Sequence, residues 1–238
     1  MNIEIYDASG NLVKELSAGK SKGINIVNWD YLLKSPKMAA GKTFTFGGFT
    51  APRANAGTYK VVLNKGKQKY ESQLVVEYDK TSLLTAADRK LHKDVTTKLF
   101  DMSESLAFHV YEINEMTTFA NRLASENPGV KSIVDKMLPT LTELKESSVI
   151  TTGDNYVGAA EPELREKLAT LYSKIAASYT PPSKSELDNM SLLEETFNSI
   201  TESLEKVKSG DWSELMKFVE KNGMETPKMM DKMEFLKG

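Results

Sequence analysis

The spacing of apolar residues changes once along this chain, near residues 78–85. Before that point apolar residues occur in short alternating runs, as in residues 60–63 and 73–78. After it they recur every three or four residues, as in the series Leu84, Ala87, Leu91, Val95, Leu99. A period near two is typical of strands and a period near 3.6 is typical of helices. The 238-residue chain is therefore predicted to hold two modules, residues 1–80 and 81–238.

The charges of the two modules have opposite signs. Residues 1–80 carry 12 Lys and Arg against 7 Asp and Glu, whereas the rest of the chain carries 19 against 26. Nucleic-acid binding is usually accompanied by a dense stripe of Arg and Lys. The lysines of the first module are scattered, and its one arginine is Arg53. We therefore expect no nucleic-acid partner.

Composition excludes several further classes of site. The chain has no cysteine, so disulfides, thiol catalysis and thiolate metal sites are excluded. It has no run of 18 apolar residues, so we expect no membrane span. The N-terminal residues lack the basic region of a signal peptide. We expect no cofactor.

The first module contains short strand-like runs separated by turn signals. These runs lie at residues 3–6, 12–16, 23–30, 57–63 and 68–78. Polar residues 7–11 predict a tight turn, and residues 64–67 predict the turn of a hairpin. Trp29 is expected to anchor the core, because Trp is the largest apolar side chain available. Short strands at this spacing predict an antiparallel β-sandwich.

A long insertion, residues 31–56, carries three closely spaced aromatic residues. They are Phe44, Phe46 and Phe49, with a Gly pair between the last two. We favour a short strand, ended by the Gly pair, that fills one side of the sandwich. The alternative is an exposed aromatic patch, which makes these three residues the candidate contacts for a ligand or partner.

Three short segments of the first module carry a resemblance. Residues 5–13 have the sequence Ile-Tyr-Asp-Ala-Ser-Gly-Asn-Leu-Val, residues 23–30 have Gly-x-Asn-x-Val-x-Trp-Asp, and residues 56–59 have Ala-Gly-Thr-Tyr. Together and in this order they resemble the immunoglobulin-like domain of flagellar hook-capping proteins. Closely related domains occur near the C-termini of many exported bacterial proteins. The resemblance implies an immunoglobulin-like fold with a structural or adhesive role.

The second module is predicted to be an elongated antiparallel α-helical bundle. Thr85 is expected to cap a helix of about 40 residues that ends at Asn127, and such a helix spans about 60 Å. Further helices are expected at residues 130–145, from about Pro162 to 179, from about Ser185 to 210, and after residue 211. The tail after Gly223 is expected to be frayed.

Neither module contains a recognisable catalytic constellation. His92 and His109 lie 17 residues apart, which is not the spacing of a zinc-binding helix motif. The carboxylates of the second module stand among Lys and Ser and do not form the paired Glu-x-x-His pattern of di-iron bundles. We therefore predict that the chain is not an enzyme and has no metal site.

The order of the modules carries a second resemblance. A β module ending in a hairpin, then Thr-Ala-Ala-Asp at 85–88, a long helix with Ile-Asn at 113–114, and Asp-Trp-Ser-Glu-Leu at 211–215 follow one another. This order is similar to the C-terminal region of bacterial sortilin-like, BNR (Asp-box) repeat β-propeller proteins, which are often described as glycosyl-hydrolase-like. The chain has no Asp-box motif and no blade repeat, so the resemblance does not extend to the propeller or its chemistry.

These observations lead to three hypotheses. The first is a non-catalytic structural or interaction module at the C-terminus of a larger exported β-propeller protein. A strand beginning at Met1 without a signal peptide leads us to expect a longer precursor, located in the periplasm or outside the cell. Its partner would be its own upstream propeller domain or another protein. The alternative is a carbohydrate-binding accessory module that uses residues 44–49 and Trp29. The third, an enzyme in the bundle, needs clustered polar residues that face inward.

Overall fold

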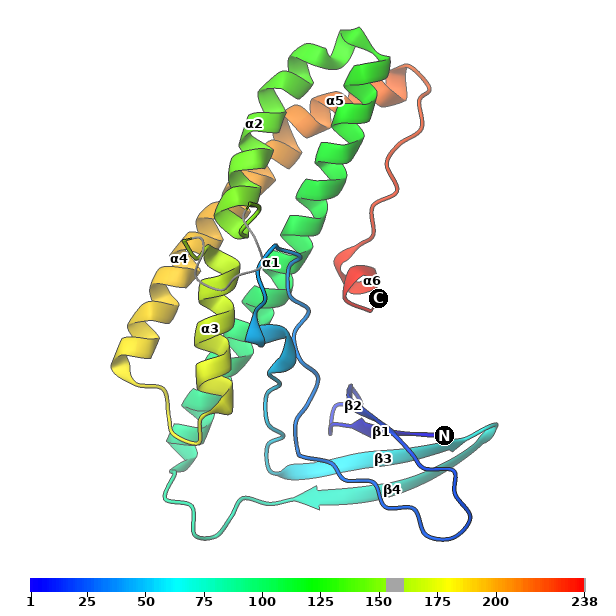
Figure 1. The fold of residues 1–238 in the computed structure, drawn as a ribbon, viewed down its shortest axis with the longest axis vertical. Coiled ribbons are helices and arrows are strands. Elements are labelled where there is room, and N and C mark those ends of the chain that lie inside the picture. The colour runs from blue at the N-terminus through cyan, green and yellow to red at the C-terminus, as the bar shows by residue number, and fades with distance from the viewer. Residues whose placement is uncertain (153–160, 238) are drawn as a thin grey trace.

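A computed structural model of the protein describes residues 1–152 and 161–237, and Figure 1 shows its fold. The side chain of Phe46 lies outside the described part. One antiparallel sheet lies near the N-terminus and a helical region follows it. The last strand ends at Val76 and the first long helix begins at Ala86. The predicted mixed β and α organisation is therefore confirmed.

The sheet has four strands in the order β2-β1-β3-β4. They are β1 (Asn2–Tyr6), β2 (Leu12–Ser17), β3 (Gly57–Lys65) and β4 (Gln68–Val76). Both predicted turns are present. The Asp7 carboxylate accepts hydrogen bonds from the backbone N–H groups of Ser9 and Asn11, each 2.9 Å long. The hairpin of β3 and β4 turns at Gly66, whose φ of 61° suits glycine.

One face of the sheet is apolar. The register pairs Ile5 with Val61 and Tyr59 with Leu74, and directly paired residues share a face. Trp29 packs at this face with its ring centroid 5.5 Å from that of Tyr59. Trp29 is only half-buried, so the expectation that it anchors the core of the first module is not confirmed.

The strand predicted over residues 23–30 is wrong. These residues form no strand, and Ile24 and Ile26 are 93% and 83% exposed. Local side-chain bonds compete with a ladder here. The Asn25 amide donates to the carbonyls of Ser21 and Gly23, and the Trp29 indole N–H donates to the Leu32 carbonyl. The part of the chain that the structure describes holds one sheet, so it lacks the second sheet of a sandwich.

The helices occupy most of the chain after residue 85. They are α1 (Ala86–Glu126), α2 (Lys131–Ser148), α3 (Leu164–Ala177), α4 (Lys184–Val207), α5 (Ser213–Lys221) and α6 (Lys232–Lys237). Short turns of other helix types, η2 (Pro128–Val130) and η3 (Lys208–Trp212), lie between them. Thr85 caps α1 together with Asp88, as predicted. The cap of α4 is Ser183, and Pro162 precedes the N-cap of α3 rather than starting the helix.

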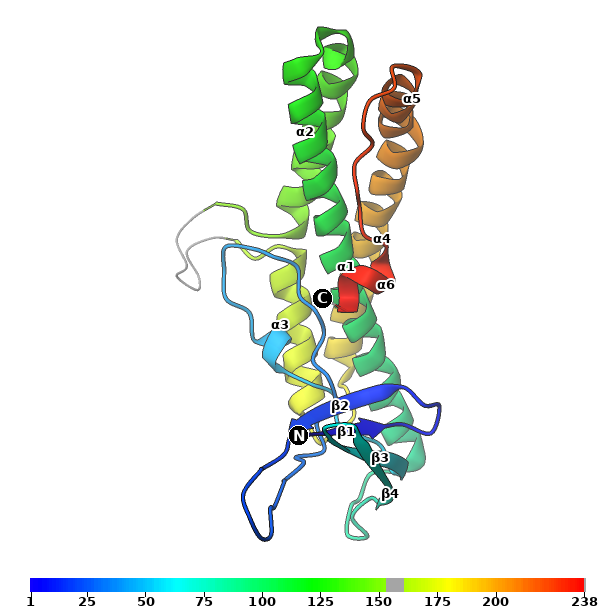
Figure 2. The ribbon, with the colours of Figure 1, turned by 90° about the vertical axis from the view of Figure 1, so that its right-hand side faces the viewer.

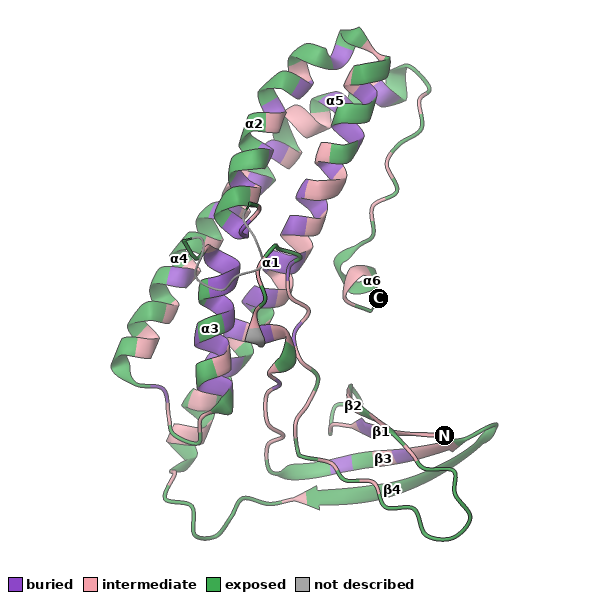
Figure 3. Ribbon diagram, in the orientation of Figure 1, coloured by how far each residue is buried: buried purple, intermediate pink, exposed green. Residues whose placement is uncertain are grey.

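The long helices form three antiparallel rows (Figures 1 and 2). Helix α1 runs the length of the helical region, α2 and α3 return along it, and α4 and α5 run in the direction of α1. Buried residues follow the facing sides of these rows in Figure 3. Fully buried large side chains there include Leu99, Leu106, Ile113, Met137, Leu141, Leu168 and Tyr172. The main core is therefore helical.

The expectation of a frayed tail is wrong. The chain after Gly223 runs back along α1 and ends in α6, as Figure 2 shows. The ring of Phe235 lies 5.0 Å from the ring of Tyr111 and 5.7 Å from the ring of Phe108. The backbone N–H of Met230 donates to the Tyr111 hydroxyl. Aromatic packing on α1 is what holds this tail in place.

Residues 31–56 leave the sheet, pass along the helices and return. Their two limbs are joined at the base, where the N–H of Leu33 donates to the Pro52 carbonyl and the N–H of Ala54 donates to the Tyr31 carbonyl. Further along, the N–H of Lys42 donates to the Ile150 carbonyl. The predicted strand at 44–49 is wrong, since residues Phe46–Phe49 form a single helical turn, η1. This insertion connects the sheet to the helical region.

Candidate functional site

The candidate site is residues 43–50, called the aromatic loop below, which lies against α3. The Arg165 guanidinium donates to the Thr43 carbonyl through both terminal nitrogens, at 3.0 and 3.1 Å. The Thr43 hydroxyl donates to the Glu166 carboxylate at 2.7 Å. Both charged residues stand at the start of α3, so the first turn of that helix holds the first residue of the loop.

Arg165 and Glu166 form a buried ion pair under the loop. A guanidinium nitrogen lies 2.6 Å from a carboxylate oxygen, and the two side chains are 8% and 11% exposed. Burying two charges costs several kcal/mol per ion, and the cost is offset only when their geometry and hydrogen bonds are good. The bonds to Thr43 supply part of that compensation, so loop and ion pair depend on each other.

The second half of the loop approaches α3 closely. A Cβ atom placed on Gly47 would lie 2.9 Å from the Cβ and 3.1 Å from the Cα of Ala169. Beyond it, the Tyr172 hydroxyl donates to the Thr50 carbonyl at 3.2 Å. Burial raises the pKa of Tyr172, so this hydroxyl keeps its proton and its hydrogen bond. The loop is fixed to α3 at both ends.

Two of the three predicted contact residues lie together on the outer side of the loop. Phe44 is 52% exposed and Phe49 is 74% exposed. Their rings stack with centroids 5.4 Å apart and planes inclined by 23°. The third, Phe46, belongs to η1, but its side chain lies outside the described part of the protein. The structure thus supports an exposed aromatic patch over the strand that we favoured.

The chemistry of this surface is apolar contact. The charged pair beneath it is buried and bound to Thr43, whereas the exposed groups are two phenyl rings. Such rings bind other apolar or aromatic surfaces and the apolar faces of sugars, with little side-chain entropy to lose.

Sequence reasoning missed the anchoring pair. Arg165 and Glu166 stand in the first turn of an amphipathic helix, where charged residues normally face water. They lie 122 and 123 residues from Thr43 in sequence, so no local pattern connects them. The available signal was the Gly pair at 47 and 48, since a glycine often marks a close approach of backbone.

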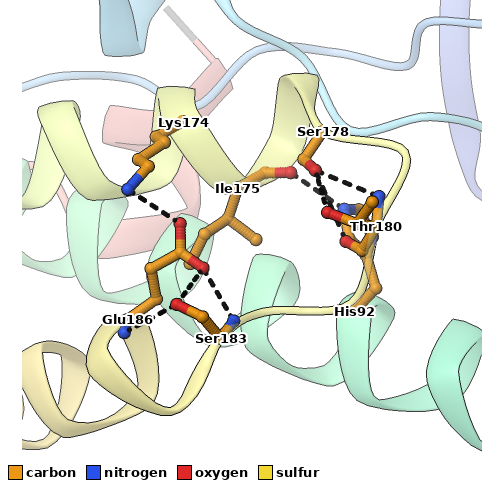
Figure 4. Close-up of polar contacts among 7 residues, drawn as sticks. All are labelled: His92, Lys174, Ile175, Ser178, Thr180, Ser183 and Glu186. Atoms are coloured by element: carbon orange, nitrogen blue, oxygen red, sulfur yellow. Dashed lines mark hydrogen bonds and ion pairs between the residues drawn. The ribbon is translucent and has the colours of Figure 1, made fainter.

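The two histidines lie apart, as their spacing predicted. The His92 ring donates from Nε2 to the Ile175 carbonyl at 2.8 Å, near the end of α3 (Figure 4). His109 stacks on Phe197 of α4 with ring centroids 5.5 Å apart. Across residues 1–152 and 161–237, no three His, Asp or Glu side chains are grouped to hold a metal ion. No described helix combines the length and the apolarity needed to cross a membrane.

Comparisons of the chain with protein-family models, with curated proteins and with solved structures found no match.

Proposed function

We propose that this protein is a non-catalytic interaction module and that the aromatic loop is its docking surface. The observation that carries the proposal is the exposed, stacked pair of Phe44 and Phe49 on a loop clamped to α3. Aromatic residues are enriched in the energetic centres of protein interfaces. A loop that is already fixed loses little conformational entropy when a partner binds.

The setting we propose is a larger exported bacterial protein. The resemblance of the sequence to the C-terminal region of Asp-box β-propeller proteins supports this setting. In the proposal, the three helical rows are the elongated bundle, and the sheet is one layer of an immunoglobulin-like sandwich. The partner is then the propeller or a second protein, encountered in the periplasm or outside the cell.

The coding sequence upstream of Met1 tests this setting. We expect an open reading frame that continues in frame upstream, with a signal peptide at its start and repeated Asp-box motifs before the sheet. A start codon at Met1 preceded by an in-frame stop codon would contradict the setting. The docking role of the aromatic loop does not depend on this result, because binding experiments test it separately.

Carbohydrate binding is the second candidate function. It is favoured by the exposed faces of Phe44 and Phe49, since phenyl rings bind the apolar faces of sugars. A glycan array read with the wild type and with Phe49→Ala tests it. We expect specific glycan-binding signals for the wild type. These signals should be about tenfold weaker for Phe49→Ala, because the variant loses one aromatic contact. Signals unchanged in Phe49→Ala would exclude this function for the loop.

A further inference from the structure

A cavity of about 600 Å³ lies where the sheet, the insertion and the helices meet. We call it the junction pocket. Its walls come from the end of β4 and the residues after it, from the returning limb at residues 52–55, and from the first turns of α1. The C-terminal end of α3, whose last turn is bound by His92 in Figure 4, closes another side. Ligand sites commonly have volumes of this size.

Two arginines of the junction pocket are held by tyrosine rings. The Arg53 guanidinium carbon lies 4.3 Å from the centroid of Tyr179, and that of Arg89 lies 4.3 Å from the centroid of Tyr78. All four residues line the pocket. Such stacking positions a guanidinium while leaving its N–H groups available. In residues 1–152 and 161–237, neither guanidinium has an ion pair or a hydrogen bond.

A buried polar residue in the pocket wall also lacks a partner. Thr96 of α1 lines the pocket and is 3% exposed, and its hydroxyl oxygen makes no hydrogen bond with the described residues. The buried Nε atom of Arg53 is likewise unpartnered within the described part. Buried polar groups are normally hydrogen-bonded. Two unsatisfied groups in the wall of one cavity therefore point to a ligand.

The charges of the pocket favour an anion. Arg53, Arg89 and Lys93 line it, against the carboxylates of Glu77 and Asp79. Asp79 already accepts hydrogen bonds from the backbone N–H and the hydroxyl of Thr81, both 2.7 Å long. One of the two carboxylates therefore already has hydrogen-bond donors, whereas the two guanidiniums have no acceptor among the described residues. An anion would gain charge-assisted hydrogen bonds from them.

The rest of the pocket wall is apolar or aromatic. It includes Tyr31, Leu33, Pro52, Val75 and Leu84. We infer that the junction pocket binds a small organic acid, with its carboxylate or phosphate on Arg53 and Arg89 and its apolar or aromatic body against this wall. The site is separate from the aromatic loop.

Titration of ¹⁵N-labelled protein with benzoate and with phenyl phosphate tests the inference. Benzamide and phenol are the neutral counterparts. We expect saturable shifts of the Arg53 and Arg89 side-chain resonances and of the Thr96 amide with the acids. Binding of the neutral counterparts should be about tenfold weaker, which is the value of one charge-assisted hydrogen bond. The stronger of the two acids identifies the preferred anion.

Three variants complete the experiment. Arg53→Gln and Arg89→Gln should each weaken binding of the better acid by about tenfold. Arg122→Gln is the matched control, because Arg122 also stacks on an aromatic ring, Phe119, but does not line the pocket. A circular-dichroism melt establishes that each variant is folded.

Three results would overturn the inference. They are the absence of saturable binding by either acid, equal binding of acids and neutral counterparts, and equal loss in the Arg122→Gln and Arg89→Gln variants. Equal loss in these two variants would show that binding of the acids depends only on the overall charge of the protein and not on the pocket.

Discussion

His109 is a titratable residue enclosed between α1 and α4. Its ring stacks on Phe197, and its Nδ1 atom is buried without a partner among the described residues. Burial, followed by the charges of Lys208 and Lys232, lowers the pKa of His109 to about 4, although the Glu205 carboxylate acts in the opposite direction. The folded protein therefore resists protonation of this ring, whereas the unfolded chain accepts a proton near pH 6.5.

This difference predicts a pH-dependent stability. As the pH falls from 6.5 to about 4, the unfolded state binds the proton first, so the free energy of unfolding falls by at most about 3 kcal/mol. His109→Phe keeps the stacking on Phe197 and removes the titration. Urea unfolding at pH 7 and pH 4.5 should show a smaller decrease for the variant than for the wild type. Equal decreases would show that His109 is not the responsible group.

Glu186 is a second residue whose charge supports the fold. Its carboxylate closes the cap of α4 by accepting hydrogen bonds from the backbone N–H and the hydroxyl of Ser183 (Figure 4). It also forms an ion pair with Lys174 at 3.1 Å. The Ser183 backbone bond, then its hydroxyl, then Lys174, lower the pKa of Glu186 to about 2. The carboxylate thus stays ionised in the folded protein at pH values where the unfolded chain is protonated.

We expect Glu186→Gln to lower the free energy of unfolding by about 1 kcal/mol at pH 7, as for other lost helix caps. Because the folded pKa is depressed, the stabilisation is present above pH 4.5 and disappears as the pH falls towards 2. Wild type and variant should therefore converge in urea unfolding between pH 4.5 and pH 2. A constant difference over this range would contradict the ionic origin of the effect.

At the scale of elements, the aromatic loop depends on its close approach to α3. A methyl group on Gly47 would meet the backbone of Ala169, whereas one on Gly48 would lie 3.3 Å from the flexible side chain of Met38. Gly47→Ala should therefore lower the free energy of unfolding by about 1–3 kcal/mol, the usual cost of overpacking. Gly48→Ala should change it by less than about 0.5 kcal/mol.

Chemical denaturation and amide hydrogen exchange of the loop measure this contrast. Faster exchange in residues 43–50 for Gly47→Ala, with unchanged exchange for Gly48→Ala, is the expected pattern. Equal effects of the two substitutions would show that contact with α3 does not fix the loop.

The elements differ in how far their own residues determine them. The start of α1 was predictable, because Thr85 and Asp88 form a capping box within four residues. The absence of a strand at residues 23–30 was not predictable. The alternation of Ile24 and Ile26 with polar residues indicates a half-buried strand wherever a neighbouring strand is available. Here the side chains of Asn25 and Trp29 bind the local backbone instead. A strand needs a partner, which a local pattern does not reveal.

The same limit applies to the candidate site. Phe44 and Phe49 were identifiable as a cluster from their spacing, but their exposure depends on α3, more than 100 residues away. The junction pocket combines Arg53, Arg89 and Tyr179 from three distant segments. Both sites depend on contacts between residues that are far apart in the sequence, and a single sequence does not reveal such contacts.

At the scale of the whole molecule, the C-terminal tail ties distant parts together. Phe235 packs on Tyr111 of α1, and the Lys37 ammonium of the insertion lies 4.2 Å from the centre of its ring. Lys37 also donates to the Phe235 carbonyl. The tail therefore contacts both the helical region and the insertion.

Phe235→Ala should detach this tail. The loss of a partly buried aromatic ring is expected to lower the free energy of unfolding by about 2 kcal/mol. Amide exchange should accelerate in residues 228–237 and in residues 34–39. Phe49→Ala is the matched control, because it removes an exposed ring and should leave both segments unchanged. Unchanged exchange in Phe235→Ala would show that the tail contributes nothing to either element.

The whole molecule is then a helical support that presents the aromatic loop on its flank and a sheet at one end (Figure 1). Its role as an interaction module is the central claim. A photo-crosslinking amino acid in place of Phe49, expressed in the source organism, tests it most directly. The same amino acid in place of Ile24 is the control, because that residue is 93% exposed but lies outside the loop.

We expect a discrete cross-linked product at position 49 and none at position 24. Mass spectrometry of that product should identify a propeller domain or another exported protein. The absence of a product at position 49, or the same product at both positions, would contradict a docking role for the aromatic loop.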